Sequence, residues 1–186
     1  MAEITLSGRA PTHYSRLVRA LHWTSFVAIA TAYALVELRG YAQRGTPLRA
    51  GMMQWHMALG LLVFVLVLPR IGLALSRPTP PIVPPLSRAT HLVAKATHVA
   101  LYLFLIVQPL LGVLLTQSND RAIVLPLVGW QLPMFVEHDH ALHEWAEDLH
   151  ETLGKAFYFV IGAHILAALW HHFGAKNNAL RRMLGR

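Results

Sequence analysis

Four long stretches of this chain carry no charged side chain, and they limit its possible folds more than any other feature does. They cover residues 20–36, 50–69, 96–119 and 156–175. A helix of about 20 apolar residues crosses the ~30 Å hydrocarbon layer of a bilayer. Charged residues make up only 13% of the chain, which is about half of their usual share in soluble domains. We therefore predict an all-α fold: a four-helix transmembrane bundle in a lipid bilayer, forming one domain over residues 1–186, with spans at about 20–38, 50–70, 96–117 and 150–173.

The segments outside these spans are predicted to stay out of the bilayer core. The apolar run 122–136 is shorter and contains Pro126 and Pro133, so we expect it at the membrane interface. The sequence SRPTPPIVPP (76–85) predicts a stiff, extended linker, because proline disfavours helix. The first twenty residues lack a basic region followed by an apolar run and a small-residue cleavage site. We therefore expect no removed signal peptide.

The charge pattern predicts how the spans are oriented. The N-terminal arm, the region around the proline linker and the C-terminal tail hold eleven basic residues and one acidic residue, Glu3. The two remaining loops hold five basic and eight acidic residues. Basic loops stay on the cytoplasmic side, so both termini are predicted to be cytoplasmic. Because the basic residues are spread between apolar runs, we expect no nucleic-acid partner.

The chain contains no cysteine, which excludes disulfides, thiolate metal sites, iron–sulfur clusters and covalently attached c-type haem. It contains twelve histidines, and ionisable residues inside membrane spans are costly and usually functional. His56 and His150 lie near the outer starts of the second and fourth spans. Counted from the outer ends of their helices, His22 and His164 reach matching depths further in. The sequence thus predicts two facing pairs, His56 with His150 and His22 with His164.

A pair of imidazoles facing each other across a helix bundle is typical of b-type haem, whose iron takes one nitrogen above and one below. Zinc would require a third and a fourth ligand, and neither a cysteine nor an intramembrane carboxylate supplies them. The alternative is that each histidine only forms a hydrogen bond to a neighbouring helix, although four rings at matched depths argue against coincidence. Spacing alone leaves His98 open as the inner ligand in place of His22.

Six motifs follow one another along residues 14–183: YSRLVRALHW, AYALVELRG, PTPPIVP, HVALYL, HETLGKAFYFVIGAHILAALWHH and KNNALRRM. Their ordered set resembles the bacterial cytochrome b561 family, whose enzymatic representative is a superoxide:ubiquinone oxidoreductase. The resemblance implies a di-haem bundle in the inner membrane, in which two non-covalent b haems are ligated by four histidines: His22, His56, His150 and His164. It also implies ubiquinone as the electron acceptor, in a pocket near the cytoplasmic side that includes His98 and His171.

Three further residues near the cytoplasmic side have both a functional and a structural interpretation. His171 follows His164 by two turns and is placed to supply a proton to a quinone; a propionate or interfacial hydrogen bond is the alternative. Arg77 and Lys95 flank the proline linker. We expect them to hold a quinone carbonyl or haem propionates, and the alternative is that they extend to lipid headgroups.

The outer loop between the first two spans is basic, on the side where basic residues should be scarce. It carries Arg39, Arg44 and Arg49 against a single acidic residue, Glu37. We expect these arginines to steer superoxide, a small anion, toward the outer haem edge. Tolerance of a few arginines in a short loop, or contact with haem propionates, is the alternative. The other outer loop adds three histidines that we expect in a solvated, acidic helix start rather than in a metal site: His138, His140 and His143.

Three classes of function were compared on these features. We favour an enzyme that oxidises superoxide to oxygen at the periplasmic side and passes electrons through two b haems to ubiquinone near the cytoplasmic side. The first alternative is a cytochrome b subunit that relays electrons between the quinone pool and a partner dehydrogenase or hydrogenase. The second is a histidine-rich metal transporter without haem. The sequence shows no large soluble docking domain, so we expect no obligatory protein partner.

Overall fold

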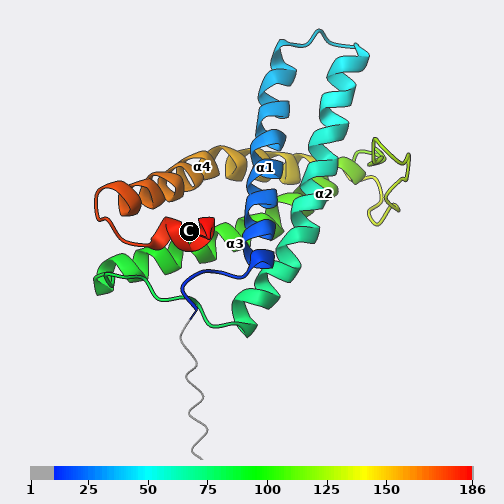
Figure 1. Cartoon of the computed structure of the whole chain (residues 1–186). Coiled ribbons are helices and arrows are strands. Elements are labelled where there is room, and N and C mark those ends of the chain that lie inside the picture. The colour runs from blue at the N-terminus through cyan, green and yellow to red at the C-terminus, as the bar shows by residue number, and fades with distance from the viewer. Residues whose placement is uncertain (1–10, 186) are drawn as a thin grey trace, which may run out of the picture.

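The computed structural model describes residues 11–185, which fold as a succession of helices (Figure 1). The long helices are α1 (Arg16–Leu38), α2 (Pro47–Ser76), α3 (Arg88–Gln117) and α4 (His140–Phe173). A short 3-10 helix, η1 (Arg39–Tyr41), follows α1, and α5 (Ala179–Leu184) lies near the C-terminus. The four long helices are long and apolar enough to cross a membrane, and residues 11–185 contain no β-strand. The predicted all-α class with four membrane-capable helices is therefore confirmed.

Each long helix begins several residues before the apolar span predicted for it. A polar side chain caps each start by accepting a backbone N–H of the first turn: Ser15, Thr46, Ser87 and Asp139. Such caps satisfy donors that have no partner within the helix. An apolar run therefore marks only the part of a helix that suits the bilayer, and the polar first turn extends beyond it. The prediction about a signal peptide concerns residues 1–20, of which residues 1–10 lie outside the described part of the chain.

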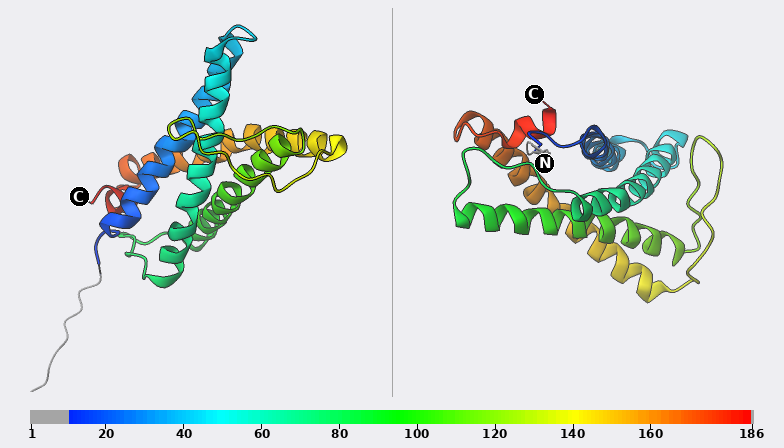
Figure 2. Two further views of the ribbon diagram at one scale, coloured as in Figure 1. Left: turned by 90° about the vertical axis from the view of Figure 1, so that its right-hand side faces the viewer. Right: turned by 60° about the horizontal axis from the view of Figure 1, so that its bottom comes forward.

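The long helices form two antiparallel hairpins that lie across each other (Figures 1 and 2). α1 packs along α2, α3 packs along α4, and the hairpins join where α2 packs on α3. Side chains that meet where the hairpins cross therefore come from segments far apart in the sequence.

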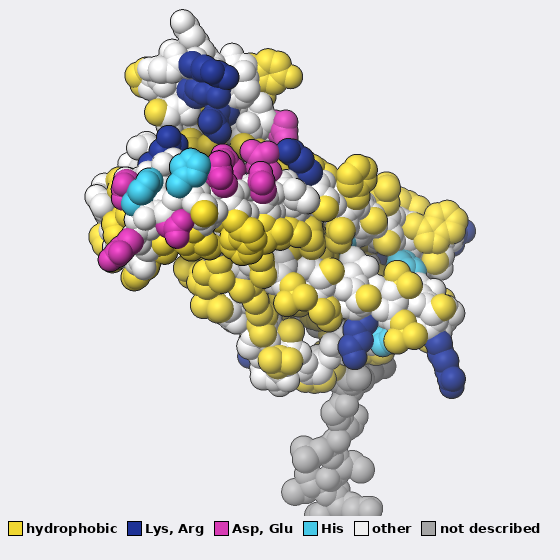
Figure 3. Space-filling view, turned by 180° about the vertical axis from the view of Figure 1, so that it is seen from behind, with side chains coloured by type: hydrophobic (Ala, Val, Ile, Leu, Met, Phe, Trp, Pro, Cys, Tyr) yellow, Lys and Arg dark blue, Asp and Glu magenta, His cyan; other side chains and the backbone are white. Residues whose placement is uncertain are grey.

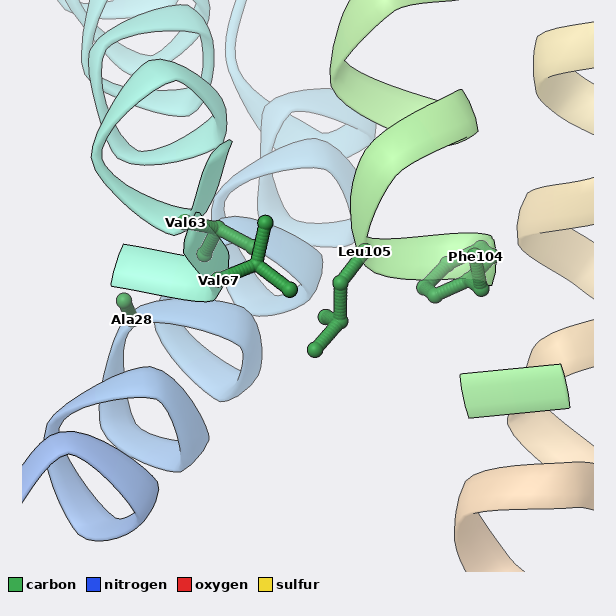
Figure 4. Close-up of a cluster of buried hydrophobic side chains, with 5 residues drawn as sticks. All are labelled: Ala28, Val63, Val67, Phe104 and Leu105. Carbon is green, nitrogen blue, oxygen red and sulfur yellow. The ribbon is translucent and has the colours of Figure 1, made fainter. Parts of the chain in front are cut away.

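A small apolar core holds the crossing together (Figure 4). Its five members, drawn from α1, α2 and α3, are at most 6% exposed: Ala28, Val63, Val67, Phe104 and Leu105. α4 joins this core through Phe157, whose ring stacks on Phe104 with 3.9 Å between the ring centroids. Many other large apolar side chains face outward (Figure 3), as expected for surfaces that contact lipid.

One buried glutamine holds the α3–α4 loop (residues 118–139). Gln117 is fully buried at the end of α3, and its side-chain amide donates to Pro133 O at 2.8 Å. Its side-chain carbonyl accepts from Phe135 N at 2.9 Å. Val124 and Gln131 form a single antiparallel bridge within the loop. The apolar run 122–136 is thus an extended turn and not a fifth helix.

The C-terminal clasp (residues 177–185) binds the proline linker at the end of the molecule where α4 finishes. The Asn178 side chain accepts from Val83 N at 2.8 Å and donates to Pro81 O at 3.2 Å. Arg182 is only 7% exposed and donates to Pro80 O. Burial lowers the pKa of Arg182, although a guanidinium stays charged in proteins. The linker itself is not helical, in line with its proline content.

The same clasp also binds the start of α1. Tyr14 N donates to Arg182 O at 3.1 Å, and the Arg182 guanidinium lies 5.4 Å from the centroid of the Tyr14 ring. Arg19 and Trp23 donate to backbone carbonyls in the last turn of α5, at 2.8 and 3.2 Å. The clasp therefore ties α1, the linker and the end of α4 to one another.

Candidate cofactor site

The structure brings His56 of α2 and His150 of α4 together as the outer pair. Outer and inner follow the predicted orientation, so the outer end is the one with the α1–α2 and α3–α4 loops. The two ring centroids lie 6.2 Å apart. His56 Nδ1 lies 2.9 Å from Ala32 O, and His150 Nδ1 lies 3.1 Å from Gln108 O. Because a carbonyl only accepts, each Nδ1 carries the proton and each Nε2 keeps its lone pair.

Three histidines from three helices form the inner cluster: His22 of α1, His98 of α3 and His164 of α4. The centroids of His22 and His164 lie 6.5 Å apart, and those of His98 and His164 lie 5.4 Å apart. Arg70 of α2 joins them, with Nη2 3.3 Å from His22 Nδ1. Its guanidinium lies 5.5 Å from the centroid of the Tyr102 ring.

These ring separations can be compared with the distance that one iron atom requires. A bond from a metal to a histidine nitrogen is about 2 Å long. Ring bonds of ~1.33 Å place each ring atom roughly 1.1 Å from the centroid. Two imidazoles on opposite sides of one iron would therefore have centroids about 6.2 Å apart. The outer pair at 6.2 Å and the His22–His164 pair at 6.5 Å both match, whereas His98 and His164 at 5.4 Å are too close.

The hydrogen bonds test the fit of a b-type haem in a second way. A metal-bound histidine nearly always donates its other ring N–H to a carbonyl, a carboxylate or water. Both rings of the outer pair do so. At the inner pair, Arg70 donates to His22 Nδ1, which leaves the His22 proton on Nε2. Ligation through Nε2 therefore requires Arg70 to turn to another acceptor, and a haem propionate is an acceptor that suits a guanidinium.

The metal-transporter alternative receives no support from the described residues. Residues 11–185 contain no group of three His, Cys, Asp or Glu side chains placed to hold one metal ion. The three histidines in and just before the first turn of α4 instead lie near acidic partners, at 3.3 to 3.7 Å: His138 near Asp120, His140 near Glu144 and His143 near Glu147. His138 and His140 are exposed, as expected for a solvated helix start, whereas the His143 side chain is only 19% exposed and its Nδ1 lies 2.7 Å from Leu115 O.

His171 lies at the end of α4, where a buried asparagine fixes the tautomer of its neutral ring. Asn177 is 5% exposed, and its Nδ2 lies 2.9 Å from His171 Nδ1. The amide orientation is set because Asn177 Oδ1 accepts from Ala179 N at 3.0 Å. Asn177 therefore donates to His171 Nδ1, and the neutral His171 ring carries its proton on Nε2.

The other residues implied for a quinone pocket are not brought together. His98 belongs to the inner cluster, as described above. Arg77 ends α2, where its backbone N–H donates to Leu73 O at 3.1 Å, and its side chain is exposed. Lys95 is also exposed on α3. Within residues 11–185, neither basic side chain forms a hydrogen bond or salt bridge to a histidine.

The three outer arginines gather at the tip of the α1–α2 hairpin. Arg49 Nη1 donates to Arg39 O at 2.6 Å and to Ala42 O at 3.0 Å, so it stabilises the turn around η1. Arg44 is exposed. Figure 3 shows basic side chains at this tip, above the acidic side chains of the neighbouring helix. The outer surface therefore has a positive tip beside a negative face.

Sequence reasoning missed three residues that shape these sites. Arg70 was used only as one of the basic residues that predict the orientation of the spans. A charged residue at the inner end of an apolar helix is, however, itself a signal of function. Gln108 donates from Nε2 to His150 O at 2.7 Å, in addition to its carbonyl contact. A Cβ on Gly112 would lie 3.3 Å from His150 Cε1. Neither Gln108 nor Gly112 gives a signal in sequence, because both contacts depend on how α3 packs against α4.

Comparison with known proteins relates these features to a family. A family model described as prokaryotic cytochrome b561 matches residues 13–186. Cytochrome b561 homolog 1 of Escherichia coli (strain K12) is 32% identical over 173 residues, which are 93% of this chain and 97% of the relative. Probable superoxide oxidase CybB of Yersinia pestis is 33% identical over 171 residues, 92% of this chain and 95% of the relative. Cytochrome b561 homolog 2 of Escherichia coli (strain K12) is 30% identical over 184 residues, with 95% and 93% covered.

Proposed function

Because this chain belongs to the prokaryotic cytochrome b561 family of membrane electron-transfer proteins, we propose that it is a di-haem oxidoreductase that oxidises superoxide and reduces ubiquinone. One observation carries the proposal: two pairs of histidine rings face each other, with centroids 6.2 and 6.5 Å apart. In each pair, one ring comes from each hairpin. The choice of superoxide rests on the likeness to the relative named as a probable superoxide oxidase. We place the protein in the inner membrane with both termini cytoplasmic, following its charge pattern.

His56 and His150 would hold the outer haem, and His22 and His164 would hold the inner haem. A b haem with two histidine ligands supplies one-electron transfer, since its iron has no open position. The chain positions the outer rings through backbone carbonyls, which fix the tautomer that leaves Nε2 for the iron.

His171 supports quinone reduction near the cytoplasmic end. Because Asn177 donates to His171 Nδ1, the neutral ring presents its Nε2–H as a hydrogen-bond donor that would hold a quinone carbonyl. At the outer end, the positive tip formed by Arg39, Arg44 and Arg49 would attract an anionic substrate.

Haem content tests the ligand assignment. We expect two non-covalent b haems per chain by pyridine haemochrome analysis. His22→Ala should leave one haem, whereas His98→Ala should retain both, because His98 lies too close to His164 to share an iron. A single haem in the unaltered protein, or the reverse behaviour of the two variants, contradicts the assignment.

Haem reduction by superoxide tests the activity. Purified protein is mixed with superoxide from xanthine and xanthine oxidase, and the reduced b-type absorbance is followed before and after ubiquinone is added. We expect reduction that superoxide dismutase abolishes, followed by reoxidation by ubiquinone. If superoxide reduces no haem while a quinol does, the protein is the relay subunit and not the enzyme.

A further inference from the structure

Arg70 carries a positive charge at the inner cluster that no carboxylate balances. It is half-buried, and its contacts are His22 Nδ1 and the face of Tyr102. The acidic residues of the described chain all belong to the outer end, at the end of α1, in the α3–α4 loop and in the first turns of α4: Glu37, Asp120, Glu137, Asp139, Glu144, Glu147, Asp148 and Glu151. Every salt bridge within residues 11–185 lies there too. The Arg70 charge therefore acts on the inner cluster without a protein counter-charge.

The outer pair is surrounded by hydrogen-bond acceptors and not by a positive charge. Both of its rings donate an Nδ1–H to a backbone carbonyl, at 2.9 and 3.1 Å. Such a bond makes the imidazole a more basic ligand, which favours the ferric over the ferrous state of an iron bound to it. The surroundings of the two pairs thus have opposite effects on a bound iron. The carbonyls at the outer pair favour the ferric state, and the positive charge at the inner pair disfavours it.

We propose that Arg70 raises the reduction potential of the inner haem above that of the outer haem, so that an electron entering from the outer side is held at the inner end. A nearby positive charge disfavours the ferric state because it repels the additional charge on the iron. Ligation by His22 Nε2 requires the guanidinium to turn from His22 Nδ1 to another acceptor such as a propionate, and in that position Arg70 still adds one positive charge to the inner site. The inference rests on the proposed di-haem function and adds the direction in which the chain biases the electron.

Potentiometric titration of the purified, haem-loaded protein tests this role through the b-type absorbance. Arg70→Gln removes the charge at similar length, Arg70→Lys keeps the charge, and Arg44→Gln is a control that removes an arginine from the outer tip. A His56→Ala form, which should keep only the inner haem, identifies the inner transition. We expect Arg70→Gln to shift the higher-potential transition downward by at least tenfold in the one-electron equilibrium, or ~59 mV. In Arg70→Gln, the potential of the lower transition should change by only a small fraction of that shift. In Arg70→Lys and in Arg44→Gln, both potentials should stay equally close to those of the unaltered protein.

Three results would overturn the proposal. The first is an inner potential that does not move in Arg70→Gln, and the second is an equal movement of both potentials. The third is loss of the inner haem in Arg70→Gln but not in Arg70→Lys, which would show that the charge retains the cofactor and does not tune it. The titration uses neither superoxide nor ubiquinone, so it stands apart from the test of substrates. Failure of the di-haem assignment itself would appear as a single haem in the unaltered protein.

Discussion

The contacts of Arg182 allow the free energy of opening the C-terminal clasp to be estimated. The variant Arg182→Ala tests this estimate. The variant loses a charge-assisted hydrogen bond to Pro80 O, of about 1.5–3 kcal/mol. It also loses the contact with the Tyr14 ring, which contributes roughly 0.5–1 kcal/mol. Even a total loss of about 2 kcal/mol raises the population of the open clasp ~30-fold. Arg181, the exposed neighbour of Arg182, provides a matched control.

Hydrogen exchange with mass spectrometry measures this opening directly. Two backbone bonds report on the clasp: Asn178 N to Val83 O and Tyr14 N to Arg182 O, both 3.1 Å long. In Arg182→Ala we expect these amides to exchange roughly 30 times faster, because exchange of such groups follows the free energy of local opening. Peptides from the centre of α2 should not change. Unaltered exchange at both amides, or the same acceleration in Arg181→Ala, would refute the reasoning.

Three further changes address the outer end and the α3–α4 loop. Gly112→Val should displace the His150 ring and lower the haem content from two toward one per chain. Gly60→Ala, whose added Cβ has nothing within 4 Å, should leave the haem content unchanged. A normal haem content in Gly112→Val would contradict this. Gln117→Leu leaves two backbone groups of the loop without a partner, and a loss of about 2 kcal/mol should lower the melting temperature by roughly 4–8 °C in a thermal-shift assay. Arg44→Gln should slow haem reduction by superoxide and flatten its dependence on salt without changing stability, and a rate indifferent to both would dismiss steering.

The features that sequence predicted best are those that depend on one helix at a time. The apolar runs located all four membrane-capable helices, because length and hydropathy are properties of a single segment. The matched depths of His22 and His164 also follow from counting along helices, and the structure places these two rings 6.5 Å apart. What that count did not decide was the choice between His22 and His98, because both lie near the inner ends of their helices.

The features that sequence missed depend on contacts between distant segments. Arg182 has no apolar or periodic pattern around it, and its burial results only from the linker and α1 meeting the clasp. Gln117 looks like an ordinary polar residue after a span, yet it is fully buried by the loop that it holds. Arg70 was visible as a charge, but its neighbour His22 belongs to another helix. Contacts of this kind between distant segments depend on the fold and cannot be predicted from the sequence alone.

The division of the four proposed haem ligands between the hairpins has a consequence for biogenesis. His22 and His56 belong to the first hairpin, and His150 and His164 belong to the second. Transmembrane helices insert before they pack together, so a newly inserted chain holds every candidate ligand in the bilayer while neither iron site exists. Haem loading would then be a late assembly step that fastens one hairpin to the other. The linker that joins the hairpins keeps their encounter within one molecule, so this step does not depend on how crowded the membrane is with other copies.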